Sequence, residues 1–174
     1  MLETAIEKAA YIEEKMKQFK LVDMREQFRD IIAGAQQESL GYMDFLVRLL
    51  SAEEEGKSAR RAEMLLGKAN FDTPSALKDI DYGFNPSLDR GRIEELGKLH
   101  FLDAHENIII IGPPGVGKSM IATGIGRNAC KAGRKVLFVN AKELVDRLYA
   151  EMHAGRLPET LGQLGRVELL IIDE

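Results

Sequence analysis

The eight residues Gly112–Ser119, with the sequence GPPGVGKS, constrain this chain more than any other segment. They fit the pattern G-x-x-x-x-G-K-[S/T] at every fixed position. The β-branched run Asn107–Ile111 precedes them, and a stretch of helical character to about Lys131 follows. Glycines at these places let the backbone turn sharply and bring its N–H groups around an anion at a helix N-terminus. The sequence therefore predicts a strand, a phosphate-binding loop and a helix, in that order.

Two side chains of this loop carry the chemistry that nucleotide phosphates need. Lys118 is placed to hold the outer phosphates, and the hydroxyl of Ser119 is placed to ligate magnesium, which neutralises charge on those phosphates. The predicted cofactors are therefore ATP and Mg²⁺. The residues expected to bind the nucleotide are Gly112, Pro113, Pro114, Gly115, Val116, Gly117, Lys118, Ser119 and Met120.

An acidic motif stands at the end of the apolar run Leu169–Ile172. Asp173 and Glu174 follow this run directly, so both carboxylates are expected at the carboxyl end of a buried strand. We expect Asp173 to support the magnesium ion and Glu174 to orient or deprotonate the attacking water, and we count Lys118 with them as catalytic. The alternative is a solvated strand end without a catalytic role.

Short apolar runs alternate with helical patterns from Asn107 onward. Strands are predicted at Asn107–Ile111, Lys135–Val139 and Glu168–Ile172, and helices to about Lys131 and over Ala141–His153. Gly133 stands where a helix C-terminal glycine belongs. This alternation predicts a parallel sheet covered on both faces. Because no covering helix follows the last apolar strand, we expect a truncated domain.

The segment from Leu2 to about Phe71 contains no proline, and its apolar residues recur at helical spacing. One expected stripe is Met24, Phe28, Ile31 and Ile32, and another is Tyr42, Phe45, Leu46, Leu49 and Leu50, with Ser39 as a candidate N-cap. Both stripes need a packing partner, so a small helical bundle is expected. The predicted division is a helical domain over 1–71, a linker over 72–86, and an α/β domain over 87–174.

Composition narrows the class of protein further. The formal net charge of −4 argues against a uniformly basic nucleic-acid binder, so any nucleic-acid contact must come from local patches. The single cysteine, Cys130, cannot form an internal disulfide, and the acidic N-terminus argues against a secretory signal. The longest apolar runs are far shorter than the roughly 20 residues that cross a bilayer. We therefore expect a cytoplasmic protein with no membrane role.

The loop and the acidic motif together resemble those of AAA+ ATPases of the helicase-loader group. The whole chain resembles the IstB family, the ATPase helpers of insertion-sequence transposition. The block Asn85–Arg90 is similar to the family's start of the ATPase domain, and the blocks Leu21–Phe28, Tyr42–Leu50 and Arg60–Phe71 resemble its helical domain. The implied fold class is α/β: an N-terminal helical domain for DNA or partner binding, followed by a truncated P-loop NTPase (AAA+) parallel α/β sheet.

The resemblance also implies a function. Such proteins assemble on double-stranded DNA as ATP-dependent homo-oligomers, deform the DNA and present it to a transposase. Double-stranded DNA, a transposase and further copies of this chain are therefore the implied partners, and ATP hydrolysis is the implied activity. In AAA+ sheets, a strand that follows the acidic motif inserts between the first and third strands, and a later region supplies an arginine finger. Neither follows Glu174, so we expect ATP binding, while hydrolysis by this chain alone is left open.

Two groups of cations are candidate DNA contacts. Helical spacing places Lys57, Arg60, Arg61 and Lys68 on one stripe, as contacts with a phosphate backbone require. The alternative for this stripe is a solvated helix face balanced by nearby acids. The second group, Arg147, Arg156 and Arg166, lies between the second and third predicted strands, where loader-type AAA+ proteins face the DNA.

Two other functions stay open at this point. A DnaC-type replicative helicase loader would grip a helicase through its N-terminal domain and touch only single-stranded DNA. Binding to duplex against single-stranded oligonucleotides separates this function from assistance to a transposase. A metabolic P-loop kinase would need a pocket for a small acceptor, of which the sequence gives no sign, and it would leave the helical half unexplained.

Overall fold

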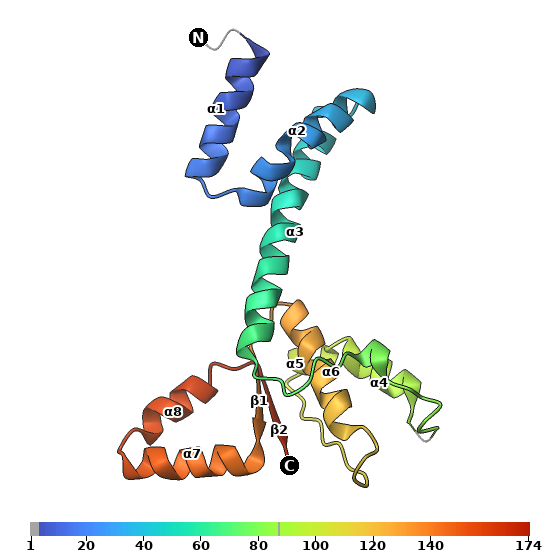
Figure 1. The fold of residues 1–174 in the computed structure, drawn as a ribbon, viewed down its shortest axis with the longest axis vertical. Helices are drawn as coiled ribbons and strands as arrows, with labels where there is room; N and C mark the ends of the chain where they lie inside the picture. The colour runs from blue at the N-terminus through green and yellow to red at the C-terminus, as the bar shows by residue number, and fades with distance from the viewer. Residues whose placement is uncertain (1–3, 87) are drawn as a thin grey trace. The chain divides into compact units, whose positions relative to one another are not determined.

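The computed structural model describes residues 4–86 and 88–174 of the chain (Figure 1). Ser87, which belongs to the block Asn85–Arg90, therefore lies outside the described residues. The chain divides into two compact units, Met1–Arg60 and Arg61–Glu174, with the boundary inside helix α3, Tyr42–Lys68. The domain limits expected from the sequence, with a linker at 72–86, stay a prediction. In the described ranges no helix is both long and apolar enough to cross a bilayer.

The first unit consists of α1 (Ala5–Gln18), α2 (Val22–Gln37) and the N-terminal part of α3. α1 begins with a capping box, in which the Thr4 hydroxyl accepts from the N–H of Glu7 and the Glu7 carboxylate accepts from the N–H of Thr4. α3 begins at Tyr42, so the prediction that Ser39 is its N-cap is wrong. Ser39 instead has a positive φ of 51° in the turn that ends α2.

The core of this unit draws on all three helices and comprises Met16, Met24, Phe28, Ile31, Leu49 and Ala52. In the stripe expected on α2, three residues are buried and Ile32 packs against the core, whereas the stripe expected on α3 is buried only in part. Leu49 is buried and Phe45 packs against the core, whereas Tyr42 is 91% exposed and Leu46 and Leu50 are exposed as well. The apolar spacing on α3 therefore predicts a helix correctly, but fewer of these side chains are buried than it suggests.

A buried carboxylate of α3, that of Glu53, caps the start of α2. The N-cap residue of α2, Leu21, makes no side-chain cap, and Glu53 accepts a hydrogen bond from the N–H of Met24 at 3.0 Å. Lys57 pairs with the same carboxylate at 3.3 Å. Burial opposes ionisation of Glu53, but the hydrogen bond from Met24 and the ion pair with Lys57 together hold its pKa below the usual glutamate value.

The second unit carries a parallel sheet of two strands. After the end of α3 it comprises the 3₁₀ helix η1 (Leu77–Asp79), α4 (Arg90–Gly97), α5 (His100–Asp103), α6 (Lys118–Lys131), β1 (Val136–Asn140), α7 (Ala141–His153), α8 (Leu157–Leu164) and β2 (Leu169–Asp173). In the parallel register, Val136 lies opposite Leu169 and Asn140 lies opposite Asp173. The α/β class is confirmed, with each strand one residue later than predicted. Helix α8 is an addition to the prediction.

The strand predicted at Asn107–Ile111 is not part of this sheet. β2 pairs along one edge with β1, and no strand of the described chain pairs with its other edge. An extended segment becomes a strand only through ladder hydrogen bonds with a neighbour, and the segment 107–111 has no such partner among the described residues. Its side chains still alternate: Ile109 and Ile111 are 83% and 89% exposed, whereas Ile108 and Ile110 pack against the core.

The residues that follow α3 pack closely on α6. A Cβ added at Gly124 would lie 2.6 Å from the side chain of Leu77. One added at Gly126 would lie 2.7 Å from Ile171 and 2.8 Å from Phe71. Because both positions lack a side chain, β2 and the segment after α3 can pack directly against α6, the helix that follows the phosphate loop.

Candidate functional site

The loop Gly112–Ser119 runs directly into α6. Gly115 and Gly117 have positive φ values of 80° and 94°. A Cβ added at either would meet no atom within 4 Å, so the backbone conformation rather than crowding requires glycine there. Gly117 is the N-cap residue of α6, and its carbonyl accepts from the N–H of Ile121 at 2.9 Å. The loop thus ends at a helix N-terminus, where N–H groups without helical partners favour an anion.

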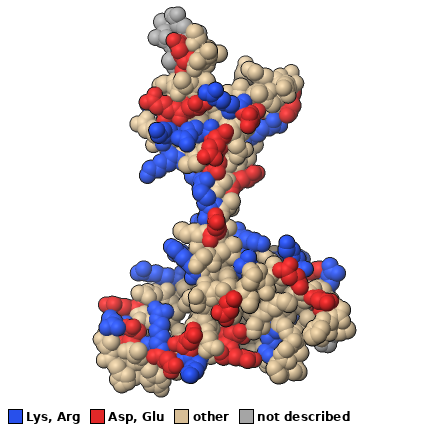
Figure 2. Space-filling view, viewed as in Figure 1, with Lys and Arg blue, Asp and Glu red and all other residues tan. Residues whose placement is uncertain are grey.

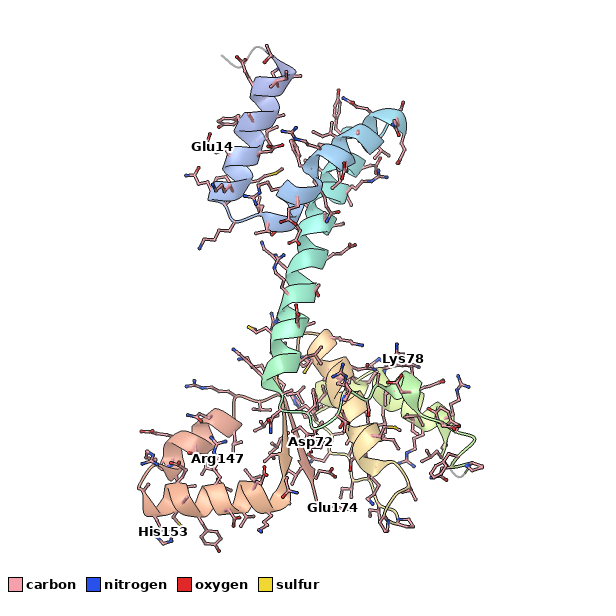
Figure 3. The ribbon with its side chains drawn as sticks, viewed as in Figure 1. Glu14, Asp72, Lys78, Arg147, His153 and Glu174 are labelled. Atoms are coloured by element: carbon pink, nitrogen blue, oxygen red, sulfur yellow. The ribbon has the colours of Figure 1, made fainter. Side chains whose placement is uncertain are left out.

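The side chain of Lys118, the first residue of α6, reaches back across the loop. Its Nζ donates to the carbonyl of Pro113 at 2.9 Å and lies 3.5 Å from Oε1 of Glu174, the residue labelled after β2 in Figure 3. The Lys118 side chain is 18% exposed, while that of Glu174 is 80% exposed. The fold therefore brings the cation of the loop next to the carboxylate at the end of β2, two groups that the sequence analysis assigned to one site.

The other residues of the loop differ in their surroundings. The Val116 side chain packs over Gly112, where an added Cβ would lie 3.1 Å from Cγ2 of the valine. Met120 faces the core of the unit. Ser119 is exposed on the first turn of α6, so its hydroxyl is open to solvent. The remaining exposed loop residues are Pro113, Pro114 and Gly115.

The carboxyl end of the sheet carries a polar residue that the sequence analysis missed. Asn140 ends β1 opposite Asp173, and its Nδ2 donates to the backbone carbonyl of Glu174. Its Oδ1 accepts from the N–H groups of Lys142 and Glu143, at 2.9 and 3.3 Å, which caps α7. An asparagine between an apolar strand and a helix is a typical N-cap, so the cap was detectable in the sequence. The bond to Glu174 was not, because it depends on the register of β1 and β2.

A cavity of about 510 Å³ lies beside β2. Its lining combines the charged side chains of Lys118, Asp173 and Glu174 with apolar residues that include Ile108 and Ile110. Over residues 4–86 and 88–174, no three His, Cys, Asp or Glu side chains gather closely enough to hold a metal ion. The arrangement can accept an anion beside Lys118, and it has two carboxylates nearby.

Two of the cations predicted to contact DNA are held by acids of the first unit. Arg60 pairs with Asp23 at 2.6 Å, and Lys57 pairs with the buried Glu53. Lys57 and Arg60 are themselves exposed, so their outer surfaces still face solvent. Both therefore have a structural role in the helical unit, whatever else they contact.

The other two cations of this stripe belong to the second unit. Arg61 donates from its guanidinium to the carbonyl of Gly133 at 3.0 Å, which closes the turn between α6 and β1. Lys68 is exposed, and no side-chain hydrogen bond or ion pair joins it to any described residue. Among these four cationic side chains, that of Lys68 is the most available for an external phosphate.

The second group of cations lies within α7 and at the two ends of α8, and Figure 3 labels Arg147 of α7. Arg147 donates to the side chain of Gln163 at 3.3 Å, and Arg156 pairs with Glu151 at 2.9 Å. Arg166 is exposed in the turn before β2. On the face shown in Figure 2, lysine and arginine are interspersed with acidic side chains rather than gathered apart from them.

Comparison with known proteins gives this arrangement a context. A family model described as "IstB-like ATP binding protein" matches residues 14–174. A Pseudomonas aeruginosa protein named as an ATP-binding protein of insertion sequence IS21 is 32% identical over 163 residues, which cover 94% of this chain and 62% of the relative. A Geobacillus stearothermophilus protein named in the same way for insertion sequence IS5376 is 35% identical over 163 residues, with 94% and 65% covered. The chain thus spans less than two thirds of the length of either relative.

Proposed function

The chain belongs to the family of IstB-like ATP binding proteins, and we propose on this premise that it binds ATP and Mg²⁺ at the loop Gly112–Ser119. We further propose that the whole protein remodels duplex DNA and assists a transposase in choosing its target. The observation that carries the first proposal is the meeting of Lys118 and Glu174 at 3.5 Å. Phosphoryl transfer uses a loop lysine that holds the phosphates and a nearby residue that positions the attacking water, so these two groups suit one site.

ATP fits this site by the chemistry of its residues. The carbonyl of Pro113 holds the ammonium group of Lys118 beside the loop, and the lysine can exchange that carbonyl for phosphate oxygens when a nucleotide binds. The backbone at Gly115 and Gly117 stays uncovered by side chains, so phosphates can approach it closely. The loop therefore offers both a side-chain cation and open backbone donors to the same anion.

Magnesium fits the same site with few protein ligands. Mg²⁺ usually keeps several waters and takes only one or two protein oxygens together with substrate phosphates. Ser119 and Asp173 would hold it here, and the ion would neutralise charge on the outer phosphates. Glu174 would orient the attacking water and take its proton, a role that its exposed carboxylate suits. Asn140 would support this role by holding the Glu174 backbone.

The proposal of a DNA partner rests on the relatives and on local charge. Both relatives are named for insertion sequences. Lys68, together with Arg166, supplies exposed cations without acidic partners among the described residues. A homo-oligomer and a cytoplasmic location complete the proposal. The competing function is that of a helicase loader of the DnaC type.

Binding measurements separate these functions. Calorimetry with ATP and Mg²⁺ should show one nucleotide per chain, and absence of binding would remove the site. Fluorescence anisotropy with a non-hydrolysable ATP analogue should then show tighter binding to a duplex than to either of its single strands. A preference for single strands favours the helicase loader instead. In a protein extended to the length of the relatives, Glu174→Gln should keep ATP binding and lose turnover, because glutamine cannot accept the proton of water.

A further inference from the structure

Asn85 reaches the phosphate loop from outside the motif. It lies in the segment between η1 and α4, is half-buried, and its Nδ2 donates to the carbonyl of Val116 at 3.4 Å. We infer that Asn85 is a positioning residue of the nucleotide site: by holding this carbonyl, it aims the N–H of Gly117 at the bound phosphates. The inference rests on the proposed binding of ATP at this loop.

The geometry of a peptide bond links the two atoms. In a trans peptide, the carbonyl and the following N–H point in opposite directions, and the described chain has no cis peptide bond. The Val116 carbonyl and the Gly117 N–H belong to one such planar unit. A donor that fixes the carbonyl on one side of the loop therefore fixes the N–H on the other side. Because glycine at position 117 has a positive φ and few steric limits, this peptide needs an external partner to keep one orientation.

The carbonyl that follows and the Val116 side chain have partners of their own. The carbonyl of Gly117 is held by the N–H of Ile121 at 2.9 Å, within the first turn of α6. The Val116 side chain is held against Gly112. Asn85 thus supplies a hydrogen bond to the Val116 carbonyl from outside the loop.

The segment that carries Asn85 is itself fixed. Oδ1 of Asp81 accepts from the N–H of Gly83 at 2.8 Å and from that of Phe84 at 3.2 Å. The backbone carbonyl of Asn85 accepts from the N–H of Leu88 at 3.1 Å. A side chain can orient a mobile loop only if its own backbone is held, and these turns on both sides of Asn85 hold it.

The same unit offers a matched control. Nδ2 of Asn128, on α6, donates to the carbonyl of Gly97 at 3.3 Å. This bond joins the same chemical groups at nearly the same length, is also part-buried, and touches no residue of the phosphate loop. Replacing Asn128 therefore measures what the loss of such a bond does to the unit in general.

The experiment compares Asn85→Ala, Asn85→Leu and Asn128→Ala with the unchanged chain. Leucine keeps the branched shape of asparagine without a charge, and it cannot donate to a carbonyl. The affinities for ADP and for inorganic pyrophosphate are measured by calorimetry, and thermal unfolding reports the fold. For both Asn85 variants we expect about fivefold to tenfold weaker binding of ADP and of pyrophosphate by the same factor, as the loss of one oriented hydrogen bond predicts. Asn128→Ala should leave both affinities unchanged.

Each other result overturns the inference. Unchanged ADP affinity in a folded Asn85→Leu chain would show that the loop orients itself. A loss for ADP without a loss for pyrophosphate would place Asn85 at the base or sugar. An equal loss in Asn128→Ala would reduce the effect to general stability, and unfolding of both Asn85 variants would make Asn85 a residue of the fold. If the unchanged chain binds neither ligand, the proposed ATP site fails instead, which is a distinct outcome.

Discussion

Each unit of the molecule contains a lysine beside a glutamate, and the two pairs are built in opposite ways. In the helical unit, Lys57 lies 3.3 Å from Glu53, and the side-chain exposures are 57% for the lysine and 5% for the glutamate. In the α/β unit, Lys118 lies 3.5 Å from Glu174, and the exposures are 18% and 80%. The less exposed member is the acid in one pair and the base in the other.

This inversion separates a structural pair from a binding pair. A buried carboxylate without partners would cost several kcal/mol, and Glu53 meets that requirement with the N–H of Met24 and with Lys57. Both contacts come from residues of the helical unit itself. The sheltered ammonium of Lys118 faces an exposed carboxylate and a backbone carbonyl, both of which water can solvate when an anion displaces them. The same two residue types therefore have different roles, and burial of the acid or of the base decides which.

The largest effect that we expect distinguishes the two lysines. Lys118→Ala should weaken ATP binding by about 100-fold or more, because it removes the loop's charge-assisted contact with the phosphates. Lys57→Ala is the matched control, and it should leave the affinity for ATP unchanged. Nucleotide titration of both variants measures this. Similar losses in the two variants would abolish the distinction between the pairs.

The next effect tests the structural pair. Glu53→Ala should lower the free energy of unfolding by about 1–3 kcal/mol, because it leaves the first turn of α2 without its cap and Lys57 without its partner. Glu54→Ala changes an exposed acid on the same helix and should have little effect. Urea unfolding monitored by circular dichroism compares them. Equal stability of the two variants would show that the carboxylate of Glu53 is dispensable.

The same residue gives the helical unit a dependence on pH. The pKa of Glu53 is lowered in the folded chain, so its contribution to stability is complete above the usual glutamate pKa and is lost as the pH falls through the lower folded value. Unfolding midpoints between neutral pH and about pH 3 should therefore fall less steeply for Glu53→Gln than for the unchanged chain. Parallel curves would mean that other carboxylates account for the whole acid sensitivity.

An effect of similar size on stability tests the close packing of α6 in the α/β unit. Gly126→Ala should cost about 1–3 kcal/mol, because the new Cβ would lie within 2.8 Å of Ile171 and Phe71. Gly162→Ala, on α8, meets no atom within 4 Å and should be neutral or stabilising by up to about 1 kcal/mol. Thermal unfolding of both variants decides. Two stable variants would show that α6 shifts easily away from the sheet.

The smallest effect concerns cations outside both pairs. Lys68→Ala should weaken duplex binding only a few-fold and reduce the slope of affinity against salt concentration by about 1, without loss of stability. Arg60→Ala should lower stability as well, because Asp23 loses its partner. Anisotropy over a range of salt, with unfolding curves as the control, separates these outcomes. An unchanged slope for Lys68→Ala would remove this residue from the DNA surface.

The sequence predicted what depends on neighbours along the chain. Helix α6 starts at Lys118 directly after the glycine pattern, and β1 and β2 lie within one residue of the predicted strands. Gly133 has the positive φ expected of the glycine that ends α6. Each of these features follows from local periodicity or from a backbone conformation that one residue type favours.

What depends on distant partners could not be predicted. The segment 107–111 has the composition of a strand, yet a strand also needs a neighbour, and the sequence does not show which edges meet. Glu53 looks like one of three successive acids until the fold places it at the start of α2. The same holds for Asn85, whose partner at Val116 lies 31 residues away. The roles assigned to Ser119, Asp173 and the DNA-contacting cations stay predictions.

The free edge of β2 has a consequence for handling this protein. Along that edge the backbone N–H and carbonyl groups of the strand have no ladder partner among the described residues, and a cavity of about 510 Å³ lined with isoleucine and leucine lies beside them. An open strand edge is a template for extended polypeptide, and natural proteins protect such edges from aggregation. Concentrated solutions of the chain should therefore lose monomer by edge-to-edge addition. A charged side chain at the exposed Ile172 should slow that loss.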